Sequence, residues 1–396
     1  MENKFIKTKI AENLYLLRVS DNDTKYFEAL WEIPEGIMYN AYLIKTKEGN
    51  VLIDGWKKPY SEKLLELLKE DLKDLKIIIV NHTEPDHSGS IKDILEYTKN
   101  KPLVLGTKMA GDLLKSFYKI DINFKQVEDG EEIKVGEYTL KFFTTPWLHW
   151  PDTMVTYVKE LKFMFTCDIF GSYGIFDSVY ADEINFDNYE PFIRKYTSTV
   201  IGAYKNYIVK NIDKIKNLGL EIKMILPGHG LLWRDPEKII DYFYKIGNES
   251  IRSKKVTIIY NSMYGLIDPA ILFTKEFIEK NGYETRVFKC TDKERPYISD
   301  IISETTDSSL IIYGISTYEN DVFPIAKYIL SMLSNKVNNK IPIIIITSYG
   351  WGPVVKQKVA NIIKGTKFII VDSIEFRGTN SKDDEKKIEE ALAKLL

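Results

Sequence analysis

The sequence predicts a two-domain α/β protein, with a mixed α+β domain first and a doubly wound parallel sheet second. Its 396 residues are too many for one ordinary hydrophobic core. The segment Asn248–Lys255 is polar and basic and follows a predicted helix at Pro236–Gly247, which places a domain boundary there. From Val256 onward, apolar strand-length runs alternate regularly with helix-like stretches, as in βαβ units. We therefore expect domains at residues 1–250 and 254–396.

The second domain is predicted to hold about five parallel strands in the doubly wound arrangement. Four of them are mostly apolar, as buried parallel strands are. The expected strands are Val256–Tyr260, Glu284–Lys289, Leu310–Gly314, Ile341–Thr347 and Phe368–Asp372.

The first domain does not alternate regularly, but its apolar strands end at unusual residues. The strand Ile77–Val80 runs directly into Asn81–His87 (NHTEPDH), and Lys223–Leu226 runs into 227–230 (PGHG). Polar residues on loops that follow rigid strands are typical of functional sites.

Composition excludes several function classes. The formal net charge of -2 gives no electrostatic reason to bind nucleic acid. The first residues lack the apolar core of a signal peptide, and runs such as Ile341–Ile346 are far too short to span a membrane. The two cysteines, Cys167 and Cys290, support neither a disulfide framework nor a thiolate metal site, so we expect a cytoplasmic protein.

The chain has only four histidines, and two of them lie in His82-x-Glu84-x-Asp86-His87. Two imidazoles and two carboxylates within six residues place several metal donors in one small volume. The alternative is a solvated acidic loop, but an apolar strand leading into such a loop favours a site. A metal centre is therefore the better interpretation of this segment.

These residues resemble the metallo-β-lactamase superfamily, whose usual motif is H-x-H-x-D-H, and the resemblance implies an αββα sandwich. Glu84 replaces the second histidine of the motif. Three later segments match the superfamily's ligand positions in order: 147–152 with His149, 166–171 with Asp168, and 227–230 with His229. With Glu84, the set resembles the flavodiiron proteins.

That resemblance implies His82, Glu84 and His149 on one iron, Asp86 and His229 on the other, and Asp168 bridging both. His87 either coordinates or acts from outside the ligand set. Three carboxylates with three imidazoles make a harder, more anionic set than zinc usually has, which favours two iron ions. Cys167 is interpreted as a packing residue. Trp147 and Trp150 are expected to wall the site, and the loop Tyr26–Pro34 either lines the cavity or belongs to the core.

The second domain resembles a flavodoxin-like FMN domain in three loops that follow predicted strands. The residues expected to contact FMN are Ser262, Met263, Tyr264, Gly265, Ser316, Thr317, Tyr318, Ser348, Tyr349, Gly350 and Trp351. The first loop departs from the family, because Leu266 and Ile267 replace polar residues and Asp268 brings a negative charge toward a phosphate. Lost charge-assisted hydrogen bonds cost roughly 1.5–3 kcal/mol each, so weak FMN binding is predicted. The alternative is a flavodoxin-like fold that has lost its cofactor and only dimerises.

The resemblance covers essentially the whole chain and implies reduction of dioxygen to water, of nitric oxide to nitrous oxide, or of both. Two irons and FMN together hold the four electrons that dioxygen needs, and the protein positions the cofactor. The resemblance also implies a head-to-tail homodimer, alone or as a dimer of dimers, and a rubredoxin-like electron donor. Two alternatives remain: a zinc-dependent metallohydrolase using a metal-bound hydroxide, and a redox-inactive binding protein.

Overall fold

A computed structural model describes residues 3–99, 101–337 and 339–396. The chain divides into two compact units, Met1–Thr197 with Tyr204–Gly247 and Ser198–Ala203 with Asn248–Leu396. Ser198–Ala203 lies with the second unit, where Thr306 donates a hydrogen bond of 2.8 Å to Ser198. The predicted limits 1–250 and 254–396 stay predictions, and residues 1 and 2 lie outside the described residues.

The first unit contains a seven-stranded sheet in the order β1-β2-β5-β6-β7-β8-β9. Its first strands pair antiparallel, and those from β6 to β9 pair parallel. The strands are β1 (Lys4–Ala11), β2 (Leu14–Asp21), β5 (Ile37–Ile44), β6 (Asn50–Ile53), β7 (Leu75–Ile79), β8 (Leu103–Gly106) and β9 (Phe124–Gln126), with a separate hairpin of β3 (Tyr26–Phe27) and β4 (Trp31–Glu32).

A second sheet of the same unit has the order β10-β11-β12-β13-β14. Only its last pair, β13 with β14, is parallel. Its strands are β10 (Glu132–Val135), β11 (Tyr138–Thr144), β12 (Met154–Val158), β13 (Phe163–Cys167) and β14 (Met224–Pro227).

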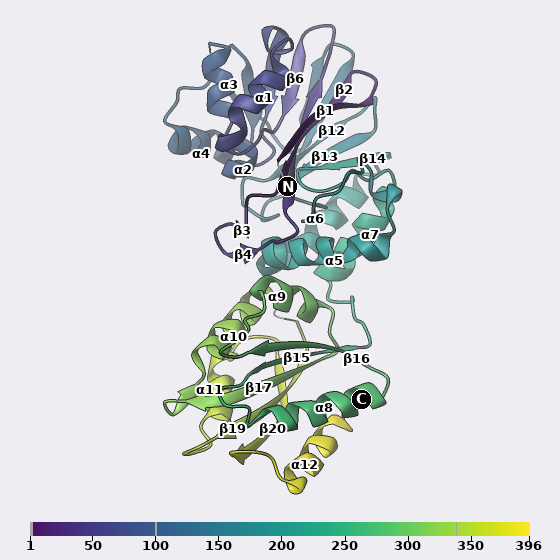
Figure 1. The fold of residues 1–396 in the computed structure, drawn as a ribbon. Coiled ribbons are helices and arrows are strands. Elements are labelled where there is room, and N and C mark those ends of the chain that lie inside the picture. Colours follow the sequence, from purple (N-terminus) through teal and green to yellow (C-terminus); the bar gives the residue numbers. More distant parts are fainter. Residues whose placement is uncertain (1–2, 100, 338) are drawn as a thin grey trace. The chain divides into compact units, whose positions relative to one another are not determined.

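The two sheets of the first unit pack face to face, with helices on their outer faces (Figure 1). The core between them joins side chains of both sheets, and the rings of Tyr42 and Phe165 meet there at 5.1 Å. The helices are α1 (Ser61–Leu68), α3 (Ile91–Tyr97) and α4 (Lys108–Tyr118) beside the first sheet, and α5 (Phe186–Tyr196), α6 (Lys205–Asn217) and α7 (Pro236–Gly247) beside the second, with the short α2 (Pro85–Ser88) between strand ends. This is the expected αββα sandwich.

The second unit has a parallel sheet in the order β16-β15-β17-β19-β20, which is the predicted doubly wound arrangement. A short strand, β18, pairs antiparallel with the end of β17 and was not predicted. The strands are β15 (Lys255–Asn261), β16 (Glu284–Cys290), β17 (Leu310–Tyr318), β18 (Asp321–Val322), β19 (Pro342–Tyr349) and β20 (Ile369–Arg377).

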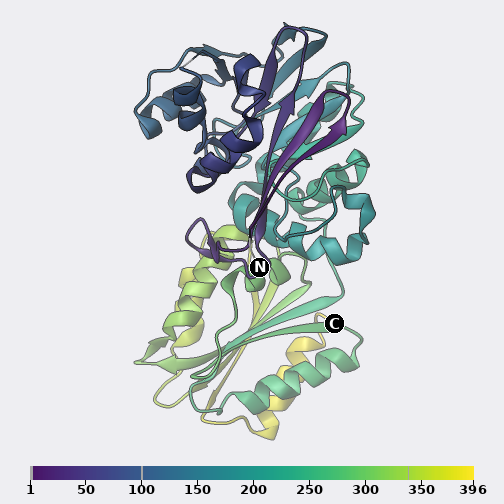
Figure 2. The same cartoon turned by 45° about the horizontal axis from the view of Figure 1, so that its top comes forward.

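Helices cover both faces of this sheet, as Figure 2 shows. On one face α8 (green) and α12 (yellow) pack on apolar residues that include Ile258, Ile312 and Ile346. The helices are α8 (Asp268–Lys280), α9 (Ile298–Thr306), α10 (Pro324–Lys336), α11 (Val355–Ile362) and α12 (Lys382–Leu392). None of the helices formed by the described residues combines the length and apolar character needed to cross a membrane.

Candidate metal centre

All seven predicted metal donors of the first unit lie at one place, at the ends of strands from both sheets. Six of them are buried, with relative exposures from 0 to 5%, and Glu84 is half-buried. They come from four loops far apart in sequence: residues 82–87 after β7, His149 after β11, Asp168 after β13, and His229 after β14. The strand ends therefore hold the donors on a rigid frame.

The loop that carries His82 is anchored through Asn81. The Asn81 backbone N–H donates to the Asp54 carboxylate at 2.8 Å, and its side-chain oxygen accepts from Thr156 on β12 at 2.7 Å. Both sheets thus fix the residue immediately before His82. Pro85 then starts α2, whose single turn presents Asp86 and His87.

The loop that carries His229 approaches His87 closely. The Gly228 backbone N–H donates to the carbonyl of Cys167 at 2.6 Å, and its carbonyl accepts from Asn40 at 2.7 Å. A Cβ atom at Gly228 would lie 2.6 Å from Cε1 of His87. Glycine is required here because any side chain would overlap the imidazole of His87.

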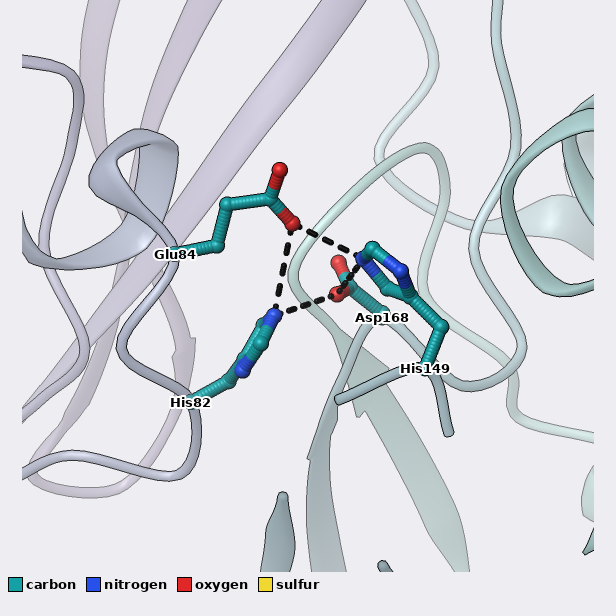
Figure 3. A group of neighbouring side chains, drawn as sticks. All are labelled: His82, Glu84, His149 and Asp168. Atoms are coloured by element: carbon teal, nitrogen blue, oxygen red, sulfur yellow. Dashed lines mark hydrogen bonds and ion pairs between the residues drawn. The ribbon is translucent and has the colours of Figure 1, made fainter. Parts of the chain in front are cut away.

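One group of donors consists of His82, Glu84, His149 and Asp168 (Figure 3). Glu84 Oε2 lies 2.8 Å from Nε2 of His149 and 3.3 Å from Nε2 of His82. Asp168 Oδ2 lies 3.3 Å from Nε2 of His82 and 3.4 Å from Nε2 of His149. Two ligand atoms each about 2.1 Å from one ion and at right angles are about 3 Å apart, so these spacings suit one metal ion.

A second group consists of Asp86, His87 and His229. Asp86 Oδ2 lies 3.3 Å from Nε2 of His229 and 3.6 Å from Nε2 of His87. Both of these nitrogens also face Asp168, whose Oδ1 atom lies 3.2 Å from His229 and 2.8 Å from His87. Asp168 therefore offers one oxygen to each group.

Several donor atoms of this cluster are buried without a hydrogen-bond partner among the described residues. They are both carboxylate oxygens of Asp86, Oδ2 of Asp168, Nε2 of His229 and Nδ1 of His87. A buried polar atom left unpaired is costly, and cations between the carboxylates and Nε2 of His229 would satisfy those atoms. The donor set therefore fits a pair of metal ions.

The charges of the cluster also favour cations. Burial opposes ionisation of Glu84, but hydrogen bonds from His149 and His82 outweigh it and lower its pKa to about 2. Burial likewise opposes protonation of His149 and His229, yet Asp168 and the neighbouring Glu84 or Asp86 raise their pKa to about 9 and about 10. Ionised carboxylates at neutral pH thus attract positive charge into a buried site.

Residues that the sequence interpretation did not single out contact the predicted ligands and fix their orientation. Asp152 accepts from the Thr83 backbone N–H at 2.8 Å and places Oδ1 3.3 Å from Nδ1 of His82. The carbonyl of Met38 lies 3.0 Å from Nδ1 of His229. The Tyr196 hydroxyl donates to Oδ1 of Asp168 at 3.0 Å. Asp152 lies within the matched segment 147–152, but neither Met38 nor Tyr196 belongs to any motif.

The remaining side chains predicted near the site have different places. Cys167 is buried directly before Asp168. Trp150 packs edge-on against His82 with ring centroids 5.1 Å apart, whereas Trp147 is 36% exposed and stacks on Tyr204. Phe27, from the loop Tyr26–Pro34, packs edge-on against His229 at 5.8 Å. Trp150 and Phe27 thus shield the cluster, whereas the ring contacts of Trp147 among the described residues are with Tyr204 and Tyr207.

The second unit brings six of the predicted flavin contacts together around a pocket of about 390 Å³. Its other lining residues are Glu319, Asn320 and Gly352, and the six predicted ones are Met263, Tyr264, Thr317, Tyr318, Gly350 and Trp351. The other predicted residues support the loops: Ser262 accepts from the Gly265 N–H at 3.1 Å, Ser316 donates to the carbonyl of Asn261, Ser348 donates to that of Gly378, and Tyr349 accepts from the N–H of Gly378. An open pocket lined by exposed aromatic rings fits a flat ring system.

This chain is similar to several known proteins over most of its length. Residues 37–230 match the family model described as ODP family beta lactamase. A nitric oxide reductase of Moorella thermoacetica is 30% identical and covers 91% of this chain and 90% of its own length. A rubredoxin-oxygen oxidoreductase of Megalodesulfovibrio gigas is 26% identical and also covers 91% of this chain and 90% of its own length. A solved flavo di-iron protein mutant of Thermotoga maritima is 39% identical, with a TM-score of 0.94 over 100% of this chain and 99% of that one.

Proposed function

Because this chain belongs to the flavodiiron protein family, we propose that it is an oxidoreductase that reduces dioxygen, nitric oxide or both. The relatives support this reaction class, since one is named a nitric oxide reductase and another a rubredoxin-oxygen oxidoreductase. These names do not favour the zinc-hydrolase alternative. Residues 1–250 form the proposed di-iron domain and residues 254–396 the proposed FMN domain.

The observation that carries the proposal is the position of Asp168 between two donor groups. Its Oδ2 atom faces His82 and His149, and its Oδ1 atom faces His87 and His229. A carboxylate in this position can bridge two ions and hold them close together. We assign His82, Glu84 and His149 to one iron, Asp86, His87 and His229 to the other, and Asp168 to both.

The protein's own contribution is to orient these ligands and exclude water. Asp152 and the Met38 carbonyl lie next to Nδ1 of His82 and of His229, so that each imidazole turns Nε2 toward the carboxylates. Trp150 and Phe27 cover two of the imidazoles with apolar rings. Glu84, with 13% of its side chain exposed, is the most accessible of the ligands, so we expect a small diatomic substrate to enter on its side.

The second unit would hold FMN in the pocket lined by Tyr318, Trp351 and their neighbours. When bound, the iron pair and FMN supply the electron transfer of the reaction. We further propose a rubredoxin-like electron donor, a head-to-tail homodimer and a cytoplasmic location. The dimer would bring the flavin of one subunit beside the irons of its partner.

The test is to purify the chain, load it with iron and FMN, and supply electrons through reduced rubredoxin. An oxygen electrode and a nitric oxide electrode should record consumption of at least one gas over many turnovers. Asp168→Asn should abolish consumption while FMN stays bound, because the substitution is confined to the first unit. A protein that consumes neither gas, or that binds zinc and hydrolyses esters, would overturn the proposal. A colourless protein that takes up no FMN would leave only a binding role.

A further inference from the structure

The start of α8 carries a negative charge beside the loop that would receive the FMN phosphate. This loop, residues 262–267, connects β15 to α8, and Asp268 is the first residue of the helix. Among the described residues, the backbone N–H groups of Met263, Tyr264 and Leu266 donate no hydrogen bond. Gly265 has φ +79°, and a Cβ atom there would meet nothing within 4 Å. Free N–H groups around open space at a helix N-terminus are suited to a phosphate.

The carboxylate of Asp268 is not left uncompensated. Lys289 on β16 places Nζ 2.8 Å from Oδ2 of Asp268. Strand pairing sets this contact, because Lys289 lies in register with Tyr260 on β15, one residue before the end of that strand. The lysine also lies over the ring of Tyr260 at 5.7 Å, and about a third of each charged side chain is exposed. Asp268 raises the pKa of Lys289, which therefore stays charged at neutral pH.

We propose that Lys289 is a positioning residue for the FMN phosphate: by pairing with Asp268, it cancels the one negative charge that would repel the phosphate from the loop. This inference rests on the proposed function, since it assumes that the second unit binds FMN. The sequence alone predicted that the negative charge of Asp268 would repel the FMN phosphate. The ion pair with Lys289 offsets that charge. The missing hydroxyls of Leu266 and Ile267 are not replaced, so the loop depends on its backbone N–H groups and on this ion pair.

The physical consequence is a selective effect on phosphorylated flavin. FMN and riboflavin share the same ring system, but only FMN carries the phosphate. Loss of Lys289 would expose the charge of Asp268 to the phosphate and leave the ring pocket of Tyr318 and Trp351 unchanged. An uncompensated unit charge within several ångströms of the phosphate, on an exposed loop where the effective dielectric is high, is worth roughly a tenfold change in affinity, and salt should reduce this effect.

The experiment measures dissociation constants of both flavins by fluorescence quenching on flavin-free full-length protein. Lys289→Met should weaken FMN about tenfold relative to riboflavin, and Lys289→Arg should retain wild-type FMN affinity. Asp268→Asn should tighten FMN relative to riboflavin, and the double variant should lie near wild type. Lys275→Met is the matched control, because Lys275 on α8 also pairs with a carboxylate, Glu279, at 2.8 Å; it should change neither flavin.

These measurements distinguish a failure of the Lys289–Asp268 role from a failure of the proposed FMN binding. Equal effects of Lys289→Met on both flavins, or FMN affinity unchanged by Asp268→Asn, would overturn the role of the ion pair. Wild-type protein that binds neither flavin would instead overturn the proposed FMN domain. Riboflavin binding by each variant serves as the check that the ring pocket has folded.

Discussion

Nε2 of His87 lies 2.8 Å from Oδ1 of Asp168, which is the shortest approach of any histidine to that carboxylate. The resemblance to flavodiiron proteins left His87 either as a ligand or as a group outside the ligand set. Its position among Asp86, His229 and Asp168 favours the first role, because all four residues present donor atoms toward one volume.

His87→Gln should therefore remove one metal and keep the other. Iron per chain is expected to fall from two ions toward one, because the group of His82, Glu84 and His149 is untouched. Metal analysis after dialysis against a weak chelator measures this. Tyr118→Phe is the control, since among the described residues its hydroxyl forms a hydrogen bond with Ser88, the residue after His87, and not with a predicted ligand. Retention of both irons in His87→Gln would place His87 outside the ligand set.

Gly228→Ala should reproduce the loss expected for His87→Gln without changing any donor. The added Cβ would lie 2.6 Å from Cε1 of His87, so the imidazole must shift from its present position beside Asp168. We expect lowered occupancy of the second metal position and an altered visible spectrum of the iron-loaded protein. An iron content and spectrum identical to wild type would show that the ring can shift without losing its metal.

Asp152→Asn should weaken metal binding although Asp152 is not a proposed ligand. Loss of the carboxylate beside Nδ1 of His82 leaves the imidazole less basic and less firmly oriented, and such changes typically cost about 10–100-fold in metal affinity. Competition with a chromophoric chelator gives the affinity directly. Asp129→Asn, an exposed carboxylate paired with Lys214, is the control. Equal affinities of wild type and Asp152→Asn would contradict an orienting role for Asp152.

The metal-free protein should lose stability as the solution becomes alkaline. Folding raises the pKa of His149 to about 9 and that of His229 to about 10, above the ordinary value of 6.5. Their contribution is complete below about pH 6.5 and disappears as the pH rises through 9 to 10. Urea unfolding with a chelator present, at a series of pH values, should show this decline. The double variant His149→Gln with His229→Gln should show a flatter curve; an equal slope would refute the assignment.

The sequence was sufficient to single out the seven side chains that the structure brings together, because each follows the end of a strand and carries its own chemistry. Their role as metal ligands stays a prediction. It was also sufficient for the parallel sheet of the second unit, where continuous apolar runs such as Ile343–Ile346 predict buried strands. It did not reveal β1, because β1 carries lysines at every second or third position and lies half-exposed at a sheet edge. A single edge strand of this kind has little apolar pattern to detect.

Side-chain contacts between segments far apart in the sequence could not be predicted from the sequence either. Tyr196 lies 28 residues from Asp168, at the end of α5, and only the packing of α5 brings the two together. Lys289 and Asp268 meet only because β16 pairs with β15 in one register. Neither contact has a local sequence pattern.

Whether Asp168 joins two redox-active metals can be measured by anomalous diffraction from iron-loaded crystals at the iron absorption edge. We expect two peaks per chain, one within reach of His82, Glu84 and His149 and the other within reach of Asp86, His87 and His229, with Asp168 touching both. A single peak, or two peaks with Asp168 turned away from one of them, would contradict it.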